Sequence, residues 1–356
     1  MQKFKLKVIT PLAITSGNKL LKNFDFFIDK NNINVINFDK LLSKLSEEKL
    51  YTITSYLETN PNELNLEQFI SEPNEIIKYS IGYYNLLDNR PVNEITEHIK
   101  NYISHNGELV WGVYIPGSSI KGAIRTAILY SIIEKKQQEY QQFISGKNYK
   151  YKEVSRFESE MLDLNLNHRN LNHRIKSLSY LKVSDSNILD SSKVLFVKNV
   201  TLLFSSRKIN EFMELIKENT EFEISISLDI DKLGSYLKQN NITNYDYQSI
   251  AQEIRNYMES LYKFSKDLIE YEKNYFKSRN LNSVYIKYGK LEKLNTKETP
   301  LIRLGKSTGK LSKTFLLRNK DQKNLLFPKT RRVVVEGRED YTPLGWAQIF
   351  SLPIRD

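Results

Sequence analysis

The sequence predicts an α+β fold in which helices cover one face of antiparallel sheets. Apolar and polar residues alternate strictly over residues 222–230, which is typical of a strand with one buried face. Apolar residues recur at helical spacing over residues 250–276, which predicts a long amphipathic helix. Alternating strands favour antiparallel sheets over a parallel sheet that is buried on both faces. Strands and helices interleave in both halves, so two ferredoxin-like units in tandem are expected.

In the first half, the hydrophobic pattern predicts a strand over residues 3–9. Two short apolar runs at 24–28 and 33–36, separated by polar turn residues, indicate a hairpin. A helical pattern then begins at Phe38. Residues 52–107 are polar with sparse apolar anchors, which we interpret as a helical insertion in the N-terminal domain.

In the second half, strands are predicted over 180–183 and 194–204, and we place a domain boundary near residue 205. The N-terminal domain would then comprise residues 1–205 and the C-terminal domain residues 206–356. The spacing of apolar residues over 209–216 predicts an amphipathic helix. Two further strands are expected, around Val333–Val335 and Trp346–Phe350.

A perfect tandem repeat occupies residues 165–174, which read Asn-Leu-Asn-His-Arg twice. A period of five matches neither the helical nor the strand periodicity, so the repeat predicts a mobile loop.

The composition excludes several classes of protein. The chain of 356 residues contains no cysteine, which excludes disulfides, thiolate metal sites and cysteine nucleophiles. It has no apolar run of about 18 residues that would span a membrane. Its first ten residues lack the apolar core of a secretory signal. We therefore expect a cytoplasmic protein with no membrane partner.

The positive charge is concentrated in one segment. The net charge is +11, and residues 303–332 carry ten Lys and Arg against one acid, Asp321. This segment therefore accounts for +9 of the total. A concentrated excess of this size favours a polyanionic partner such as RNA.

One stretch has the pattern of a strand, a turn and a helix. Residues 113–115 are apolar, Pro116 and Gly117 form a turn, and either Ser118 or Ser119 can cap the helix that follows. The start of that helix would present free backbone N–H groups beside Lys121 and Arg125, which is a suitable place for a phosphate.

A glycine-bounded loop at residues 305–309 resembles a phosphate-binding loop without matching the P-loop pattern. Pro300 stands where the first glycine of that pattern belongs, and Leu311 follows Lys310 where a hydroxyl should bind magnesium. The loop still offers backbone N–H groups and lysines to an RNA backbone.

The titratable residues give no clear catalytic or metal-binding pattern. The four histidines, at 98, 105, 168 and 173, have no ligand spacing and are expected at the surface. Turn and capping roles explain Asp185 and Asp190. The same roles explain Asp25 and Asp29, although a carboxylate there that guides RNA cleavage stays open as an alternative. We predict no catalytic residue, no metal and no cofactor.

Four segments together resemble a known family. Residues 115–125, Ile-Pro-Gly-Ser-Ser-Ile-Lys-Gly-Ala-Ile-Arg, resemble the signature of the CRISPR-associated RAMP proteins. Leu181–Ser186 is similar to the strand-end motif that follows it, and Arg303–Lys310 is similar to the family's C-terminal glycine-rich loop. Residues 328–332 with 343–346 resemble the closing segment of one branch, the fifth subunit of type III-A (Csm) effector complexes.

The resemblance implies a protein of two ferredoxin-like RAMP domains that binds RNA without cleaving it. Such a subunit would cap one end of a filament of related subunits, near the 3′ end of the guide RNA. Its implied partners are the guide RNA, target RNA, other RAMP subunits and the cellular nucleases that trim the guide during its maturation in antiviral defence. The family's other subunits suggest the alternative, a RAMP endoribonuclease that cleaves target or precursor RNA. In this glycine-rich loop, Lys306 and Lys310 replace the aromatic or small residues frequent in relatives.

The residues that we predict to contact RNA combine the helix start with the basic segment. They are Ser118, Ser119, Lys121, Arg125, Arg303, Lys306, Ser307, Thr308, Gly309, Lys310, Lys313, Lys329, Arg331 and Arg332.

Overall fold

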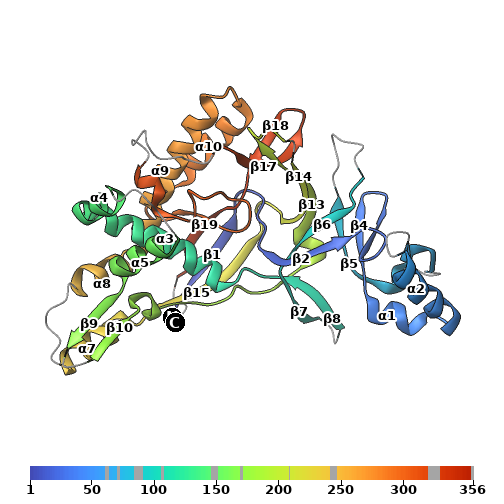
Figure 1. Cartoon of the computed structure of the whole chain (residues 1–356), viewed down its shortest axis with the longest axis horizontal. Helices are drawn as coiled ribbons and strands as arrows, with labels where there is room; N and C mark the ends of the chain where they lie inside the picture. The colour runs from blue at the N-terminus through green and yellow to red at the C-terminus, as the bar shows by residue number, and fades with distance from the viewer. Residues whose placement is uncertain are drawn as a thin grey trace.

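The computed structural model describes residues 1–60, 64–69, 73–83, 91–105, 108–145, 151–168, 171–207, 209–240, 247–319 and 329–353. Two large sheets lie in the middle of the elongated molecule, with helices at both ends (Figure 1). The predicted α+β class is confirmed, and neighbouring strands are mostly antiparallel.

The first sheet has five strands, and all its neighbours are antiparallel. Its strands, in spatial order, are β11 (Leu181–Val183), β15 (Glu221–Leu228), β1 (Gln2–Val8), β19 (Trp346–Ser351) and β16 (Leu301–Arg303). Along β1, Phe4, Leu6 and Val8 are buried while the residues between them are more exposed, so the alternation in the sequence fixes which face packs inward.

The second sheet has nine strands among the described residues. In spatial order they are β2 (Thr15–Leu21), β6 (Glu94–His98), β14 (Asn210–Ile216), β13 (Leu195–Leu203), β5 (Ile77–Tyr83), β4 (Asn32–Ile36) and β3 (Phe26–Asp29), with β17 (Arg331–Gly337) joined to β13 and β18 (Asp340–Pro343) to β17. Two pairs, β13 with β5 and β14 with β6, are parallel. Two small sheets complete the strands: β12 (Leu189–Asp190), β8 (Glu108–Val113) and β7 (Lys100–His105), and the hairpin β9 (Leu164–His168) with β10 (Leu171–Ile175).

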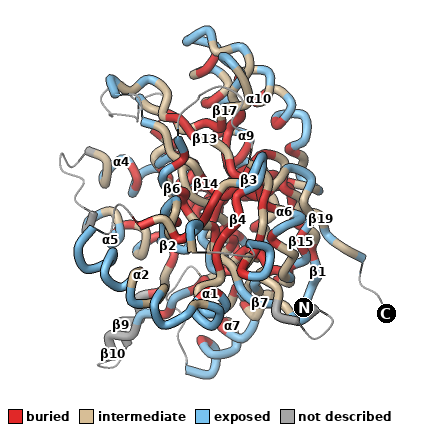
Figure 2. The backbone as a smooth tube through the Cα atoms, turned by 90° about the vertical axis from the view of Figure 1, so that its right-hand side faces the viewer, coloured by how far each residue is buried: buried red, intermediate tan, exposed pale blue. Residues whose placement is uncertain are grey.

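The helices cover the sheets and form the ends of the molecule. They are α1 (Phe38–Lys44), α2 (Glu47–Thr59), α3 (Gly117–Lys135), α4 (Gln137–Ser145), α5 (Tyr151–Leu162), α6 (Ser191–Val194), α7 (Ile230–Gln239), α8 (Tyr247–Arg255), α9 (Tyr257–Lys277) and α10 (Asn282–Leu294), with short 3-10 turns at Leu66–Phe69, Pro73–Ile76, Ser177–Tyr180 and Phe315–Asn319. Helices α3 and α9 pack on each other and on the five-stranded sheet. Figure 2 shows the buried core running through this layer and between the sheets. No helix in the described ranges is long and apolar enough to cross a membrane.

Strands from both sides of residue 205 are shared by the two large sheets. Strand β1 lies between β15 and β19, and β13 pairs with β14 across the expected boundary. A boundary near residue 205 therefore does not separate the sheets. Hydrogen bonding between strands connects segments regardless of their order, which the linear pattern of the sequence does not reveal.

Two predicted helical regions contain strands instead. The segment predicted as an amphipathic helix over 209–216 is β14, whose last four residues are all buried. Both faces of the strand are covered, since Met213 and Leu215 belong to one buried hydrophobic cluster and Ile216 to another. The insertion predicted as helical over 52–107 is helical only as far as α2 and the short turns, and strands β5, β6 and β7 follow. The prediction interpreted the polar residues of these strands as solvent-exposed residues of helices. In the structure, these polar residues are paired within the fold.

The tandem repeat forms a hairpin, so the prediction of a loop was wrong. Strands β9 and β10 pair from Leu164↔Ile175 to His168↔Leu171, and the two residues between the strands lie outside the described residues. Each copy of the repeat contributes four residues to one strand, 165–168 to β9 and 171–174 to β10.

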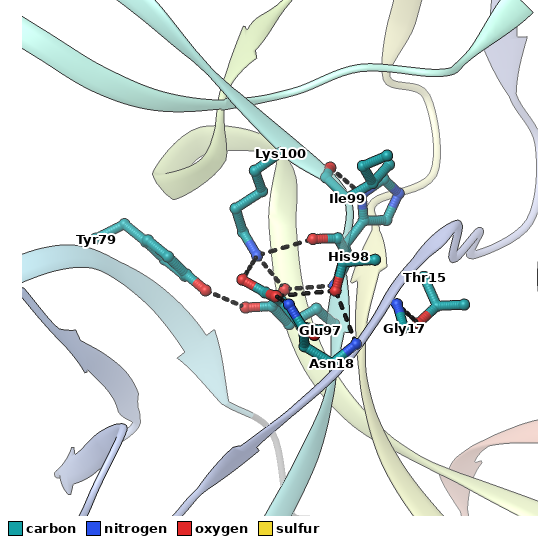
Figure 3. Close-up of polar contacts among 10 residues, drawn as sticks. Thr15, Gly17, Asn18, Tyr79, Glu97, His98, Ile99 and Lys100 are labelled. Atoms are coloured by element: carbon teal, nitrogen blue, oxygen red, sulfur yellow. Dashed lines mark hydrogen bonds and ion pairs between the residues drawn. The ribbon is translucent and has the colours of Figure 1, made fainter.

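A buried polar network ties β6 to β14 and β5 (Figure 3). Glu214 is fully buried and accepts hydrogen bonds from Tyr79 Oη (2.8 Å) and from the His98 backbone N–H (2.8 Å). Lys100 pairs with the same carboxylate. Glu97 lies at the edge of the network and accepts a hydrogen bond from Ser16 Oγ (2.9 Å) on β2. The network satisfies a buried charge at the junction of three strands.

Candidate nucleic-acid interface

The start of α3 docks directly against residues 183–186. The Gly117 N–H donates to Asp185 Oδ1 (2.7 Å), the Ile115 N–H donates to Ser186 Oγ (2.9 Å), and the Ser186 N–H donates to the Ile115 carbonyl (3.0 Å). The two motifs that suggested the family are therefore one structural unit. Asp185 caps helix α3 from a distant segment of the same chain, which confirms its predicted capping role.

The prediction that Ser118 or Ser119 caps the helix was wrong. Helix α3 begins at Gly117, and Pro116 occupies the N-cap without a side-chain bond. The Gly117 N–H is bonded to Asp185, and the N–H groups of Ser119 and Ile120 both reach the Pro116 carbonyl. At most one of the first four amide groups is then left for a ligand, so the helix start is a weaker phosphate site than its sequence indicates.

Gly117 is required by close packing in this unit. A Cβ atom at this position would lie 2.4 Å from the Val183 carbonyl oxygen and 2.6 Å from that of Ser184. Gly122, one turn further on, has open space where a Cβ would stand. The first glycine is therefore structural, whereas the second leaves the surface of α3 open beside the serines.

The glycine-rich loop is held by backbone contacts with distant segments. The Lys306 N–H donates to the Ala13 carbonyl (2.7 Å), and the Leu304 N–H donates to the Gly345 carbonyl (2.7 Å). Gly305 has φ +91°, and a Cβ there would meet the Ala13 carbonyl oxygen at 2.2 Å. The loop is thereby fixed beside the start of β2 and opposite α3.

A cleft of about 490 Å³ lies between α3 and this loop. Its walls bring together the two segments that the sequence nominated separately. The lining residues are Ile14, Thr15, Ser118, Ser119, Gly122, Ala123, Arg125, Thr126, Arg303, Leu304, Gly305, Lys306, Ser312 and Lys313. Among the described residues, the lining includes four cations and no carboxylate. The cleft therefore has the shape and charge to accept an anionic chain.

The cations of the cleft differ in how far they are already neutralised. Arg125 donates to Glu158 (2.9 Å) and Lys306 pairs with Glu211 (2.5 Å). Lys313 is exposed and forms no ion pair within the described ranges. Partial burial of its ammonium group, followed by the positive charge of Arg303, lowers the pKa of Lys313. A bound phosphate would reduce the repulsion between the positive charges of Lys313 and Arg303.

Part of the charge excess in the basic segment is neutralised by three acids from other parts of the chain, Glu134, Glu211 and Glu272. Arg331 is buried and its Nε donates to both carboxylate oxygens of Glu272 (2.9 and 2.7 Å). Arg318 pairs with Glu134 (3.3 Å). The prediction that Arg331 contacts RNA was therefore wrong, because its guanidinium supports α9 from inside the fold. Residues 320–328 of the segment lie outside the described residues.

Glu211 forms ion pairs with two further cations of the basic segment. Lys306 and Arg332 each pair with one of its oxygens, at 2.5 and 2.7 Å. Partial burial alone would raise the pKa of Glu211, but the hydrogen bonds from Lys306 and Thr96 and the charge of Arg332 hold that pKa below its usual range. Lys306 lies in the lining of the cleft and Arg332 lies outside it, and Glu211 partly screens the charge of both.

The predicted contact residues fall into three groups. Those that line the cleft are Ser118, Ser119, Arg125, Arg303, Lys306 and Lys313. Those outside the lining with exposed or half-buried side chains are Lys121, Ser307, Gly309, Lys310, Lys329 and Arg332. Those that are buried are Thr308, whose hydroxyl donates to the Gly305 carbonyl (3.1 Å), and Arg331; Arg303, although in the lining, is also mostly buried.

Eight lining residues were not among the predicted contacts: Ile14, Thr15, Gly122, Ala123, Thr126, Leu304, Gly305 and Ser312. Thr15 begins β2 and Ile14 precedes it, while Thr126 is on the inner side of α3. Neither charge nor a motif marks these three in the sequence. Only the docking of the glycine-rich loop on Ala13 brings β2 to the cleft.

The other titratable candidates lie apart from the cleft lining. Asp25 accepts a hydrogen bond from the Leu21 N–H (2.7 Å), which confirms a turn role, and burial raises its pKa. Asp190 caps α6 through the Ser192 N–H (3.0 Å). His98 is buried rather than exposed as predicted, and that burial lowers its pKa to about 3. The side chains of the other three histidines lie outside the described residues.

With this fold and cleft in place, comparison with known proteins identifies the class. The model of the RAMP superfamily matches residues 5–294, so the chain belongs to that superfamily.

Within the superfamily, the chain is similar to proteins of one kind. It is 27% identical over 346 residues to the CRISPR system Cms protein Csm5 of Methanocaldococcus jannaschii, covering 93% of this chain and 77% of the relative. A chain of the cryo-EM structure of a Csm–crRNA–target RNA ternary complex in a type III-A CRISPR-Cas system matches with TM-score 0.71, 23% identity and coverage of 98% and 100%. The crystal structure of T. onnurineus Csm5 matches with TM-score 0.68, 21% identity and coverage of 96% and 99%.

Proposed function

We propose that this protein is a non-catalytic RNA-binding subunit of a type III-A CRISPR-Cas (Csm) effector complex. Its partners would be the guide RNA, target RNA and the other RAMP subunits, and it would cap the filament near the 3′ end of the guide. The likeness to Csm5 proteins over at least 93% of the chain supports this assignment, as does the match to a chain of a Csm–crRNA–target RNA complex. We further propose that guide maturation needs the capping subunit, while separate nucleases trim the RNA.

The observation that carries the RNA-binding proposal is the cleft between α3 and the glycine-rich loop. Its lining offers cations, hydroxyls and backbone groups with no carboxylate among the described residues. Such groups bind the sugar–phosphate backbone and fix its position without reading the bases. That behaviour suits a subunit that must hold guides of many sequences.

The alternative function is a RAMP endoribonuclease that uses Asp25, Asp29 or a histidine. Asp25 is engaged in a turn, and Asp29 is at the exposed end of β3. Neither lines the cleft, and the buried His98 is kept neutral by its low pKa. A base that is remote from the bound strand cannot take a proton from it, so the geometry favours the non-catalytic function.

The test removes two lysines that form no ion pair among the described residues. In the variant Lys310→Gln/Lys313→Gln, we expect about a tenfold loss of affinity for a single-stranded guide RNA near 0.1 M salt, with unchanged thermal stability. The salt dependence of log K should fall by about 0.7 for each phosphate that the variant no longer neutralises. Fluorescence anisotropy with the full chain measures both quantities.

The control removes the same charge far from the cleft. Lys40 on α1 and Lys238 on α7 are both exposed, and these helices lie at opposite ends of the molecule (Figure 1). Lys40→Gln/Lys238→Gln should bind RNA as the wild type does. Equal losses in both variants would mean that only total charge matters and would overturn the cleft proposal. Cleavage of labelled RNA that Asp25→Asn abolishes would favour the endoribonuclease instead.

A further inference from the structure

A second aromatic and basic surface lies at the end of β13, where the chain turns toward β14. Phe204 follows β13, Tyr275 is in the last turn of α9, and Lys329 precedes β17. The Phe204 and Tyr275 rings are in edge contact, with centroids 5.7 Å apart. The Tyr275 hydroxyl donates to the Lys329 carbonyl. Three segments that are remote in sequence thus meet at one point of the surface.

Phe204 adopts a backbone conformation that phenylalanine rarely takes. Its φ is +61°, in the left-handed region, and 39% of the residue is exposed. A bulky residue is an outlier in this region, where Asn or Gly would be relaxed. The ring packs against Tyr275 and Phe276, with centroids 5.7 and 6.4 Å away, and part of it remains exposed. Strained residues of this kind concentrate at functional sites.

Arg279 covers the aromatic pair and keeps donors available. Its guanidinium carbon lies 3.7 Å from the Tyr275 ring centroid and 5.1 Å from that of Phe204. Nη1 donates to the Tyr275 carbonyl (3.3 Å) and to Ser278 Oγ (3.2 Å), which fixes the plane of the group. Arg279 forms no ion pair among the described residues, so its full charge faces outward.

Two further exposed cations flank this surface without ion pairs in the part of the chain that the structure describes: Arg207 in the β13–β14 turn, and Lys329. Arg331, beside Lys329, stacks under Tyr275 with its guanidinium carbon 4.0 Å from the ring centroid, but Glu272 neutralises it inside the fold. The surface therefore presents three uncompensated positive charges around one exposed aromatic ring. A guanidinium and an aromatic ring side by side suit a nucleotide, whose phosphate and base need these two partners.

We propose that Phe204, Arg207, Arg279 and Lys329 form a second contact site for single-stranded RNA, in which a base stacks on Phe204 and the basic groups bind the adjoining phosphates. The site rests on the proposed RNA-binding function and extends it beyond the cleft. Continuity supports the extension, because β17 runs from this surface through Arg332, which shares Glu211 with Lys306 in the cleft wall. One strand of RNA would pass over both sites.

The test separates stacking from stability. Phe204→Asn removes the ring contacts but places at φ +61° a residue that tolerates this conformation, so the two effects offset and the melting temperature should stay about equal. We expect a five- to tenfold loss of affinity for a single-stranded RNA of about 30 nucleotides, since base stacking on an aromatic ring contributes on this scale. Tyr51→Asn, at the highly exposed Tyr51 on α2, is the matched control and should change neither quantity.

A second experiment tests the three basic groups with the triple variant Arg207→Gln/Arg279→Gln/Lys329→Gln. The slope of log K against log salt should fall by about 0.7 for each phosphate released from a cation, and by about 2 in total if all three cations bind. Photocrosslinking of RNA that contains 4-thiouridine should place crosslinks on the peptide around Phe204 in the wild type and none there in Phe204→Asn.

The outcomes distinguish this site from the proposed function. Normal RNA affinity in Phe204→Asn, together with weakened binding in Lys310→Gln/Lys313→Gln, would overturn the second site and leave the cleft intact. Binding of RNA by neither surface would overturn both. Unchanged RNA binding with loss of assembly in the triple variant would show that this surface contacts a protein, which also overturns the proposal.

Discussion

The contact between the start of α3 and residues 183–186, here called the joint, and the cleft beside it use neighbouring residues in opposite ways. In the joint, Gly117 and Asp185 are committed to each other through a 2.7 Å hydrogen bond, and Gly117 leaves no room for a side chain. In the cleft, Ser118 is exposed and Gly122 has open space around it. The residues that make the motif recognisable hold the backbone, while those between them remain available to a ligand.

The basic segment divides in the same manner. Arg331 and Arg332 are adjacent in β17 and point to opposite faces, as successive residues of a strand must. Arg331 is buried against Glu272, whereas Arg332 is partly exposed beside the cleft wall. A positively charged residue therefore contributes to binding only where no acid elsewhere in the fold already neutralises it.

The largest expected effect on stability comes from substituting the buried member of this pair, Arg331. Arg331→Ala leaves Glu272 buried without its partner, so the free energy of unfolding should fall by about 4 kcal/mol. Urea unfolding of the full chain measures this change. The double variant Arg331→Met/Glu272→Leu should recover most of the loss, because it removes both charges together. If Arg331→Ala were as stable as the wild type but weakened RNA binding, the residue would belong with the exposed group.

A smaller effect compares the two glycines of α3. Gly117→Ala forces a Cβ against the Val183 and Ser184 carbonyls and should cost about 3 kcal/mol, by overpacking a site with no room to relax. Gly122→Ala is the matched control and should be neutral or stabilising by up to about 1 kcal/mol, since alanine is the better helix former. Chemical denaturation of both variants gives the comparison, and equal stabilities would show that the joint is not close-packed.

The smallest stability effect uses pH to probe the buried network below the cleft. Burial, and then the positive charge of Lys100, hold the pKa of His98 at about 3, against 6.5 in the unfolded chain. Because the folded pKa is depressed, this contribution to stability is complete above pH 6.5 and is lost as the pH falls toward 3.

Between pH 7 and pH 5, His98 alone should lower the free energy of unfolding by about 2 kcal/mol. His98→Gln removes this contribution, so the slope of stability against pH should become shallower while the cost of the substitution itself cancels. An unchanged slope in His98→Gln would mean that the imidazole is accessible to protons in the folded protein.

The sequence predicted the elements whose pattern is local. The alternating residues of β1 and β15, the β3–β4 hairpin and the presence of helix α3 after a turn all follow from periodicity and turn residues, whereas the cap of α3 does not. The glycine-rich loop and the serines of α3, which the sequence indicated separately as RNA contacts, both contribute to the lining of one cleft.

The sequence could not predict what depends on distant partners. Strand β14 is buried because residues from distant segments cover both of its faces, and its short apolar cluster fits a helix equally well. Arg331 is indistinguishable from Arg332 until Glu272 is placed beside it. The burial of His98 follows from pairing with β2 and β14, which no local pattern encodes.

The position of β1 between β15 and β19 sets the order in which this protein can fold during synthesis. Phe4 pairs with Ile224 on one side and with Ser351 on the other. At roughly 5–20 residues per second, the ribosome completes the second partner on the order of tens of seconds after the first strand emerges. Until β15 is made, neither edge of β1 has its partner in the five-stranded sheet, and until β19 is made, one edge still lacks it. The nascent chain is then open to mispairing at the free edge, and β19 closes that edge.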